Sequence, residues 1–137
     1  MKKIEFLFVL LFFVSQQVFA QDVLSKIDKE MQTCFENKQY TTAGMTECTY
    51  KTISKLEKEI KIDNSKILKI LKNEQKYIFY ENHKKWEVYK NSQINLINGI
   101  GSNKEGTIYQ NIVAGSIVEI YKDRIKFLQE LLNTISN

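Results

Sequence analysis

Apolar side chains recur three or four residues apart along most of the chain, which is the spacing of one stripe of an α-helix. The pattern predicts helices over about residues 22–35, 43–72, 74–96 and 107–134. Residues 63–65 interrupt the second stripe, so we expect the long helix to bend or break there. The sequence has no alternating apolar and polar run bounded by turns. We therefore predict an all-α fold, a small helical bundle of about four helices with one long central helix.

The stripes also predict which side chains form the core. Trp86 is the only tryptophan, and we expect it to be a core residue rather than a ligand platform, because burying a large aromatic ring stabilises a small helical bundle efficiently. The predicted core includes Ile27, Met31, Leu56, Phe79, Trp86, Ile117, Ile120 and Leu128.

Two stretches between the predicted helices look like connections. Residues 37–39 form the first, and Thr41 or Thr42 is a candidate N-cap for the helix that follows. Residues 98–103 contain Gly99 and Gly101 and give the clearest loop signal beyond the first twenty residues. We expect a loop there between the last two helices.

The first twenty residues have the layout of a secretory signal peptide. Two lysines precede nine consecutive apolar residues, 6–14, and residues 18–20 (Val-Phe-Ala) supply a cleavage site. Nine residues are too few to span a bilayer as a helix, although an uncleaved membrane anchor is the alternative. We expect residues 21–137 to form one domain that is exported, to the periplasm or beyond the cell, and that has no stable membrane insertion.

Charge gives little indication of a nucleic-acid partner. The chain of 137 residues has 20 Lys and Arg against 16 Asp and Glu, and the predicted mature chain keeps 18 and 15 of them, a net charge of +3. The lysines are scattered, and Arg124 is the only arginine. Nucleic-acid binding normally needs a dense basic patch with interleaved aromatic residues. We therefore expect no nucleic-acid partner.

The sequence motifs of catalysis and metal binding are absent. There is no Gly-rich phosphate loop, no His-Glu-x-x-His and no Gly-x-Ser-x-Gly. His83 is the only histidine and has no nucleophile beside it in the sequence. One histidine and two cysteines cannot form a four-ligand zinc site by themselves. We expect a non-enzymatic protein without a cofactor or a metal.

Cys34 and Cys48 are the only cysteines. In an exported chain, two cysteines fourteen positions apart are expected to pair, and two buried free thiols are the alternative. The disulfide would join the end of the first helix to the start of the second. A closed loop of this size contributes roughly 3 kcal/mol to stability.

A series of short motifs extends along the chain after Cys34. It contains Thr42-x-x-Met45-x-x-Cys48, a long Lys- and Glu-rich helix, Trp86-x-x-Tyr89-Lys90-Asn91, Gly101-Ser102 and a closing helix with Arg124 and Leu128. This series resembles the LprI-type lysozyme inhibitor family. The resemblance covers roughly residues 28–132. It implies a small exported helical domain in which Thr42, Met45, Trp86, Tyr89 and Arg124 have structural roles.

The chain also departs from the pattern of that family. Relatives usually have Gln in place of His83 and Arg-Asp in place of Lys90-Asn91. They commonly carry two further cysteines, near the positions of Ile94 and of residues 115–116 here. Losing both while keeping the first two is expected if the family's disulfides join the first to the second cysteine and the third to the fourth.

The resemblance implies a protein partner, and lysozyme is the named target. Gly101, Ser102 and Lys104 of the expected loop are the candidate contact residues, because a lysine on a loop can enter an acidic cleft; an ordinary helix connection is the alternative. Animal lysozymes are usually basic, so long-range charge would not steer the two proteins together. For the whole chain, the alternatives are an immunity or interaction protein for another cell-wall-directed toxin and a structural envelope module without an enzyme target.

Overall fold

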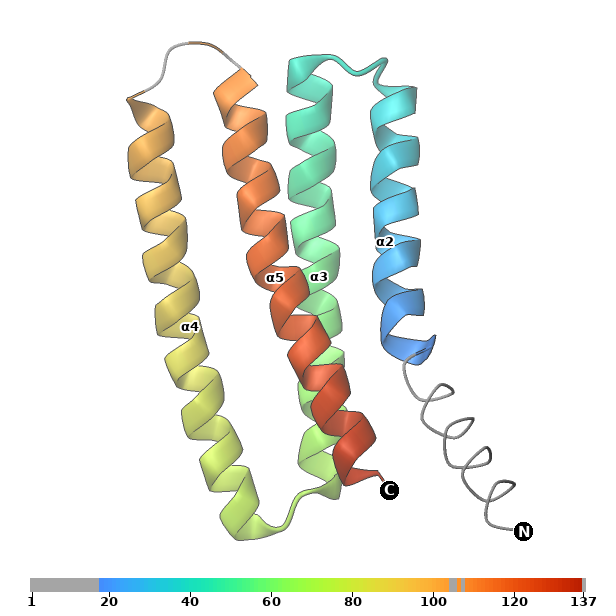
Figure 1. Cartoon of the computed structure of the whole chain (residues 1–137), viewed down its shortest axis with the longest axis vertical. Coiled ribbons are helices and arrows are strands. Elements are labelled where there is room, and N and C mark those ends of the chain that lie inside the picture. Colours follow the sequence, from blue (N-terminus) through green and yellow to red (C-terminus); the bar gives the residue numbers. More distant parts are fainter. Residues whose placement is uncertain (1–17, 104–105, 107, 137) are drawn as a thin grey trace, which may run out of the picture.

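The computed structural model describes residues 18–103, 106 and 108–136, and they form four helices. These are α2 (Val18–Asn37), α3 (Thr42–Ile70), α4 (Asn73–Ser102) and α5 (Ile108–Ile135). Successive helices run in opposite directions, which places α3 and α5 parallel to each other (Figure 1). The described part of the chain contains no strand. The prediction of an all-α bundle is confirmed.

Most of the predicted signal peptide, residues 1–17, lies outside the described residues. Residues 18–20 form the first turn of α2. Cleavage after Ala20 stays a prediction.

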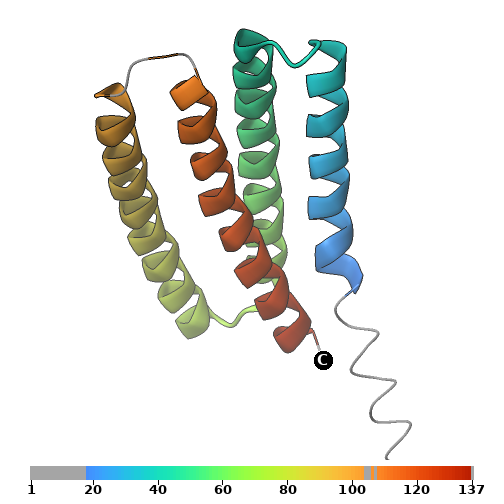
Figure 2. The same cartoon turned by 45° about the horizontal axis from the view of Figure 1, so that its top comes forward.

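The core lies mainly between α3 and α5. These two helices share the most extensive contact, α2 packs on both of them, and α4 lies mainly against α5 at the outer edge of the bundle (Figures 1 and 2). The buried apolar cluster consists of Leu24, Ile27, Ile53, Leu56, Ile60, Ile67, Phe79, Ile117, Val118, Tyr121, Ile125 and Leu128. Five of the eight predicted core residues belong to it.

The other three predicted core residues are only partly buried. Trp86 packs against the cluster from α4. Met31 is outside the cluster. The buried apolar side chains of α2 are Leu24 and Ile27, both nearer the start of the helix. Ile120 lies at the edge of the α5 stripe, whose buried positions are taken by its neighbours. The prediction was wrong in placing Met31 and Ile120 in the core.

The predicted interruption of α3 at residues 63–65 is wrong. The helix continues to Ile70, and the hydroxyl of Ser65 donates to the carbonyl oxygen of Lys61 at 2.9 Å within it. Asp63 occupies the buried stripe of α3 between Ile60 and Ile67. A polar residue on that stripe does not interrupt the helix. It places a polar side chain in the core instead.

The predicted loop at residues 98–103 is also wrong over most of its length, because α4 continues to Ser102. A Cβ atom at Gly101 would collide with Cγ2 of Val113 on α5. The glycine therefore permits a close approach between two helices and does not mark a turn. Gly106, with a φ of 102°, is the glycine of the connection that adopts a left-handed backbone.

The connection between α2 and α3 is tight. Gln39 and Tyr40 have φ angles of 52° and 53°, in the left-handed region. Thr41 is the N-cap of α3, and its Oγ1 accepts a hydrogen bond of 3.2 Å from the backbone N–H of Gly44. The first of the two N-cap candidates is thus confirmed, and the turn returns the chain so that α3 lies alongside α2.

Candidate functional site

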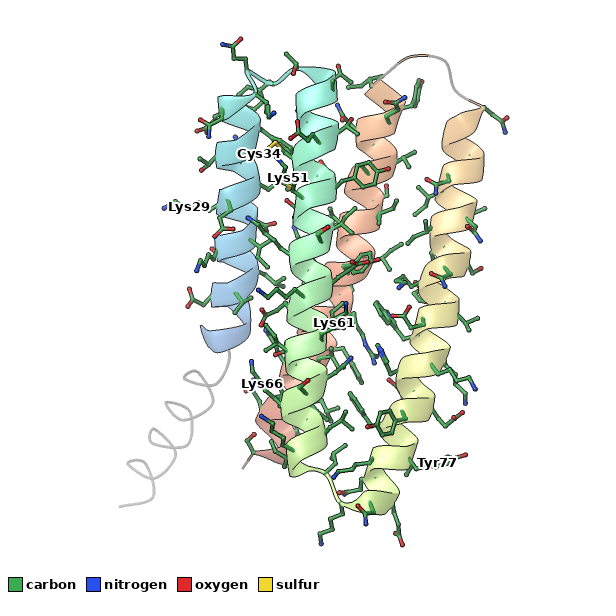
Figure 3. All side chains as sticks on the ribbon, turned by 180° about the vertical axis from the view of Figure 1, so that it is seen from behind. Lys29, Cys34, Lys51, Lys61, Lys66 and Tyr77 are labelled. Atoms are coloured by element: carbon green, nitrogen blue, oxygen red, sulfur yellow. A yellow bond between two sulfur atoms is a disulfide. The ribbon has the colours of Figure 1, made fainter. Side chains whose placement is uncertain are left out.

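The predicted disulfide joins α2 to α3. Cys34 and Cys48 are bonded, with their Cα atoms 5.8 Å apart, and Cys48 is almost completely buried (Figure 3). The pairing predicted from the sequence is confirmed, and the bond fits an oxidising compartment.

The motif residues between the two cysteines lie at the start of α3. Thr42 begins the helix, and its carbonyl oxygen lies 3.0 Å from the hydroxyl of Thr46. The same hydroxyl is 2.6 Å from the amide oxygen of Asn111 on α5. Met45 is partly buried beside them. This end of the bundle thus has polar contacts between α3 and α5 as well as the covalent link between α2 and α3.

Ion pairs cover the outer surface of the disulfide-linked helices. Glu47 lies 2.8 Å from Lys38 and 2.6 Å from Lys51, and Glu30 lies 2.5 Å from Lys55. Hydrogen bonds from Lys38 and Lys51 lower the pKa of Glu47 to about 2. Exposed pairs of this kind contribute little to stability because water and salt screen them. We therefore regard these pairs as a solvated surface and not as a binding site.

A cluster of aromatic and cationic side chains surrounds Trp86 on α4. The ring of His83 stacks on Trp86 at 5.8 Å between centroids, and Tyr121 of α5 meets it edge-on at 6.1 Å. The Nζ atom of Lys90 and the guanidinium carbon of Arg124 each lie 5.1 Å from the Trp86 ring centroid. Cation–π contacts of this geometry stabilise, and more strongly when water is excluded. The cluster links α4 to α5.

A cavity of about 200 Å³ opens beside this cluster, between α3, α4 and α5. Its carboxylates already have partners: Glu57 accepts a hydrogen bond of 2.8 Å from the hydroxyl of Tyr121, and Glu87 pairs with Lys90 at 2.5 Å. The cavity is lined by Glu57, Ile60, Lys61, Asn64, His83, Trp86, Glu87, Lys90 and Tyr121. Three of the described helices contribute polar side chains to it.

The environment of the cavity shifts two titrations. Burial, followed by the nearby charge of Arg124, lowers the pKa of His83, so its imidazole stays neutral at physiological pH. Burial and the hydrogen bond to Glu57 raise the pKa of Tyr121. Neither residue is placed as a nucleophile or as a base for one. The described residues also contain no group of three His, Cys, Asp or Glu side chains arranged to hold a metal ion.

Arg124 is 5% exposed and has no carboxylate partner within the described chain. Its Nη1 donates to the side-chain oxygen of Asn82 at 3.0 Å, and its guanidinium lies between the rings of Trp86 and Phe127. Burial lowers its pKa. The aromatic rings compensate part of the cost of burying the charge, so Arg124 acts as a structural contact between α5 and α4.

The structure brings only some of the family-motif residues together. Trp86 and Arg124 are in contact, whereas Tyr89 is 55% exposed and lies outside the cluster. The sequence pattern did not indicate Tyr121 or Glu57 as site residues. Tyr121 lies on the same helical stripe as the predicted core residues of α5, so its spacing from Ile117 contained the missing signal.

Two of the three candidate contact residues, Gly101 and Ser102, lie at the end of the bundle where α4 and α5 meet. Gly101 and Ser102 belong to the last turn of α4, and Lys104 lies outside the described residues. Large exposed apolar side chains flank this connection on both helices: Leu96, Ile100, Ile108 and Ile112. Sequence analysis did not identify this apolar surface.

The comparisons with known proteins give one match. A family model described as lysozyme inhibitor LprI matches residues 34–128. No curated protein and no solved structure matches the chain significantly. The matched range contains the disulfide, the Trp86 cluster and the end where α4 and α5 meet. Within the described residues, no helix is long and apolar enough to cross a membrane.

Proposed function

Because the chain belongs to the LprI family of lysozyme inhibitors, we propose that it is an exported, non-enzymatic protein that binds and blocks a peptidoglycan-cleaving muramidase. The family match over residues 34–128 is the observation that carries this proposal. The disulfide supports export, because such bonds persist in oxidising compartments. The periplasm is the proposed location.

We place the contact surface at the end of the bundle where α4 and α5 meet. The exposed side chains of Leu96 and Ile100 precede the connection that contains Lys104, and those of Ile108 and Ile112 follow it. Exposed apolar groups that lie together on one surface favour association with another protein. Because Lys104 lies between these two pairs in the sequence, we propose that it belongs to the same contact surface.

The charge of the chain supports an apolar contact with one inserted cation. A protein with a net charge of +3 is not steered towards a basic muramidase, so short-range burial must supply most of the binding free energy. Muramidase catalysis depends on two carboxyl groups, one of which is kept protonated. Lys104 inserted between them would neutralise the carboxylate and exclude the substrate.

The test is inhibition of muramidase by the purified mature protein, followed as clearing of a peptidoglycan suspension over a range of salt concentrations. An apolar contact predicts inhibition that changes little with salt, since only the charged part of the interface is screened. Lack of inhibition by the parent protein would exclude a muramidase target. Capture of a different cell-wall-directed toxin would then favour the immunity-protein alternative.

Two pairs of variants locate the surface. Ile100→Asp should weaken inhibition by about tenfold or more, whereas Ile70→Asp, an exposed isoleucine at the opposite end of the bundle, should leave inhibition unchanged. Lys104→Glu should weaken it by about tenfold, and Lys58→Glu, on the exposed face of α3, should not. Equal inhibition by the Ile100 and Ile70 variants would move the contact surface away from this end.

A further inference from the structure

Two buried oxygen atoms near the lower end of α3 and α5 have no hydrogen-bond donor. Asp63 of α3 has no exposed surface; its Oδ1 lies 3.0 Å from Nζ of Lys66, and its Oδ2 has no partner. Gln129 of α5 is 8% exposed, and its Oε1 also has no partner. A buried acceptor without a donor is destabilising by the full cost of its desolvation. The site therefore lacks a donor.

Contacts between the helices show what lies opposite these two side chains. On the parallel helices α3 and α5, Tyr121 is hydrogen-bonded to Glu57. Counting onward from this pair along both helices places Asp63 within about one turn of Gln129 along the bundle. Between α2 and α3, Cys34 is bonded to Cys48 and Glu30 pairs with Lys55; Lys38, just after α2, pairs with Glu47.

These helices are antiparallel, so the same register places Asp63 opposite residues 19–22 of α2. The ion pair of Asp28 with Lys122 sets the register between α2 and α5. Continued towards the start of α2, this register places Gln129 opposite residue 21. Figure 3 agrees, since Lys66 lies on α3 near the level at which α2 begins. The two unpartnered oxygens thus lie at the level of the predicted cleavage site, between Ala20 and Gln21.

The charged side chains around Asp63 leave its Oδ2 without a donor. Glu59, one turn before it on α3, is a second carboxylate; the charges of Lys66 and Lys58 act on Glu59, and Lys66 contacts only Oδ1 of Asp63. Burial and the charge of Asp63 raise the pKa of Glu59. Gln129 is neutral, and Asp22 on α2 is exposed to solvent. A cationic N–H donor at this point would satisfy Oδ2 of Asp63 and Oε1 of Gln129.

We propose that Asp63 and Gln129 form a binding site for the primary ammonium group of Gln21, which cleavage of the signal peptide creates. Cleavage removes the turn of α2 that lies at this level and leaves in its place a cation with three N–H donors. The uncleaved chain cannot supply that cation, so maturation completes the core. The inference rests on the predicted cleavage after Ala20 and does not depend on the identity of the protein partner.

The test measures the pKa of the amino terminus in the mature protein. Intact mass first verifies that the exported chain begins at Gln21, and NMR of uniformly ¹³C-labelled protein then follows the Cα and carbonyl shifts of Gln21 as its unmodified α-amino group titrates. A buried carboxylate partner should raise the pKa of this group by about one unit above the usual value near 8. Asp63→Asn should abolish the increase. Asp123→Asn, which changes an aspartate whose side chain is 72% exposed, should leave it unchanged.

A second variant keeps the test valid if Asp63→Asn does not fold. A glycine inserted between Gln21 and Asp22 preserves the cleavage site and the buried aspartate but displaces the ammonium group by one residue, and it should also abolish the increase. An α-amino pKa that is the same in the parent and in either variant would overturn the proposal. So would a mature chain that begins elsewhere, or one whose Gln21 has cyclised with loss of ammonia. The measurement involves no muramidase, so it is independent of the inhibition assay.

Discussion

The hydroxyl of Tyr121 on α5 donates a hydrogen bond of 2.8 Å to Oε1 of Glu57 on α3. The ring of Tyr121 also meets Trp86 of α4 edge-on. One buried side chain therefore contacts both neighbouring helices, although α4 itself lies mainly against α5. The position of α4 depends on this contact more than on direct packing against α3.

Tyr121→Phe should destabilise the fold, because it removes a hydrogen bond to a charged group and leaves Glu57 without that donor. We expect a loss of about 1.5–3 kcal/mol, measured by urea unfolding at neutral pH. Tyr89→Phe is the matched control, since Tyr89 is exposed, and it should change stability by less than about 0.5 kcal/mol. Equal stability of the Tyr121 variant and the parent would mean that water replaces the bond at no cost.

Gly101→Ala should also be destabilising, contrary to the usual effect of alanine in a helix. The new methyl group would collide with Val113 and separate α4 from α5, at a cost of about 1–3 kcal/mol. Gly99→Ala is the control: nothing lies near its Cβ position, and alanine should stabilise the helix there by up to about 1 kcal/mol. Thermal unfolding distinguishes the two. Val113→Ala should restore part of the loss in the Gly101 variant, and no rescue would place the strain elsewhere.

Removal of the disulfide should cost roughly 3 kcal/mol, through the loop that Cys34 and Cys48 close. Replacement of both residues by serine should lower the urea midpoint of the oxidised protein to about that of the reduced parent. A reducing agent should lower the midpoint of the parent and leave the double variant unchanged. A parent that is insensitive to reductant would show that the bond contributes little to the free energy of unfolding.

The helical stripes alone predicted the fold class, because burial on one side of a helix requires that spacing of apolar residues. The disulfide was predictable for a different reason, since the two cysteines have no other partner in the chain. Both arguments use local or pairwise information. They needed no knowledge of how the helices are arranged.

The errors share a physical cause. Asp63 and Gly101 have weak helix preference, so the sequence suggested a break at one and a loop at the other. In the structure, tertiary contacts decide both cases: Asp63 is enclosed by the core, and Gly101 lies against Val113. The cavity beside Trp86 was not predictable either, because its lining residues come from three helices that are distant in the sequence.

Trp86→Ala should destabilise the protein by about 3 kcal/mol, the lower part of the range for large aromatic truncations, because Trp86 is only partly buried. The substitution also removes the ring that Lys90 and Arg124 contact. Trp86→Phe keeps an aromatic ring and should cost less. Urea unfolding gives both values. Native fluorescence of the parent should be blue-shifted relative to the unfolded chain, and a native spectrum like that of the unfolded chain would contradict packing against the core.

The imidazole of His83 is held neutral in the folded chain, so we expect it to make stability depend on pH. Burial and the charge of Arg124 lower its pKa in the folded chain below the usual value of 6.5. The unfolded state therefore binds a proton more tightly, so the stability that neutral His83 contributes is present above pH 6.5 and is lost as the pH falls towards the folded pKa.

Because the chain has a single histidine, NMR can follow its Cε1–H signal without ambiguity, and we expect a midpoint below that of the unfolded chain. His83→Gln should reduce the loss of unfolding free energy between pH 7.5 and pH 5, since glutamine does not titrate. The carboxylates titrate in both proteins, so the difference between the two pH profiles isolates the histidine. A folded midpoint at or above 6.5 would mean that the imidazole is solvated and that Arg124 does not act on it.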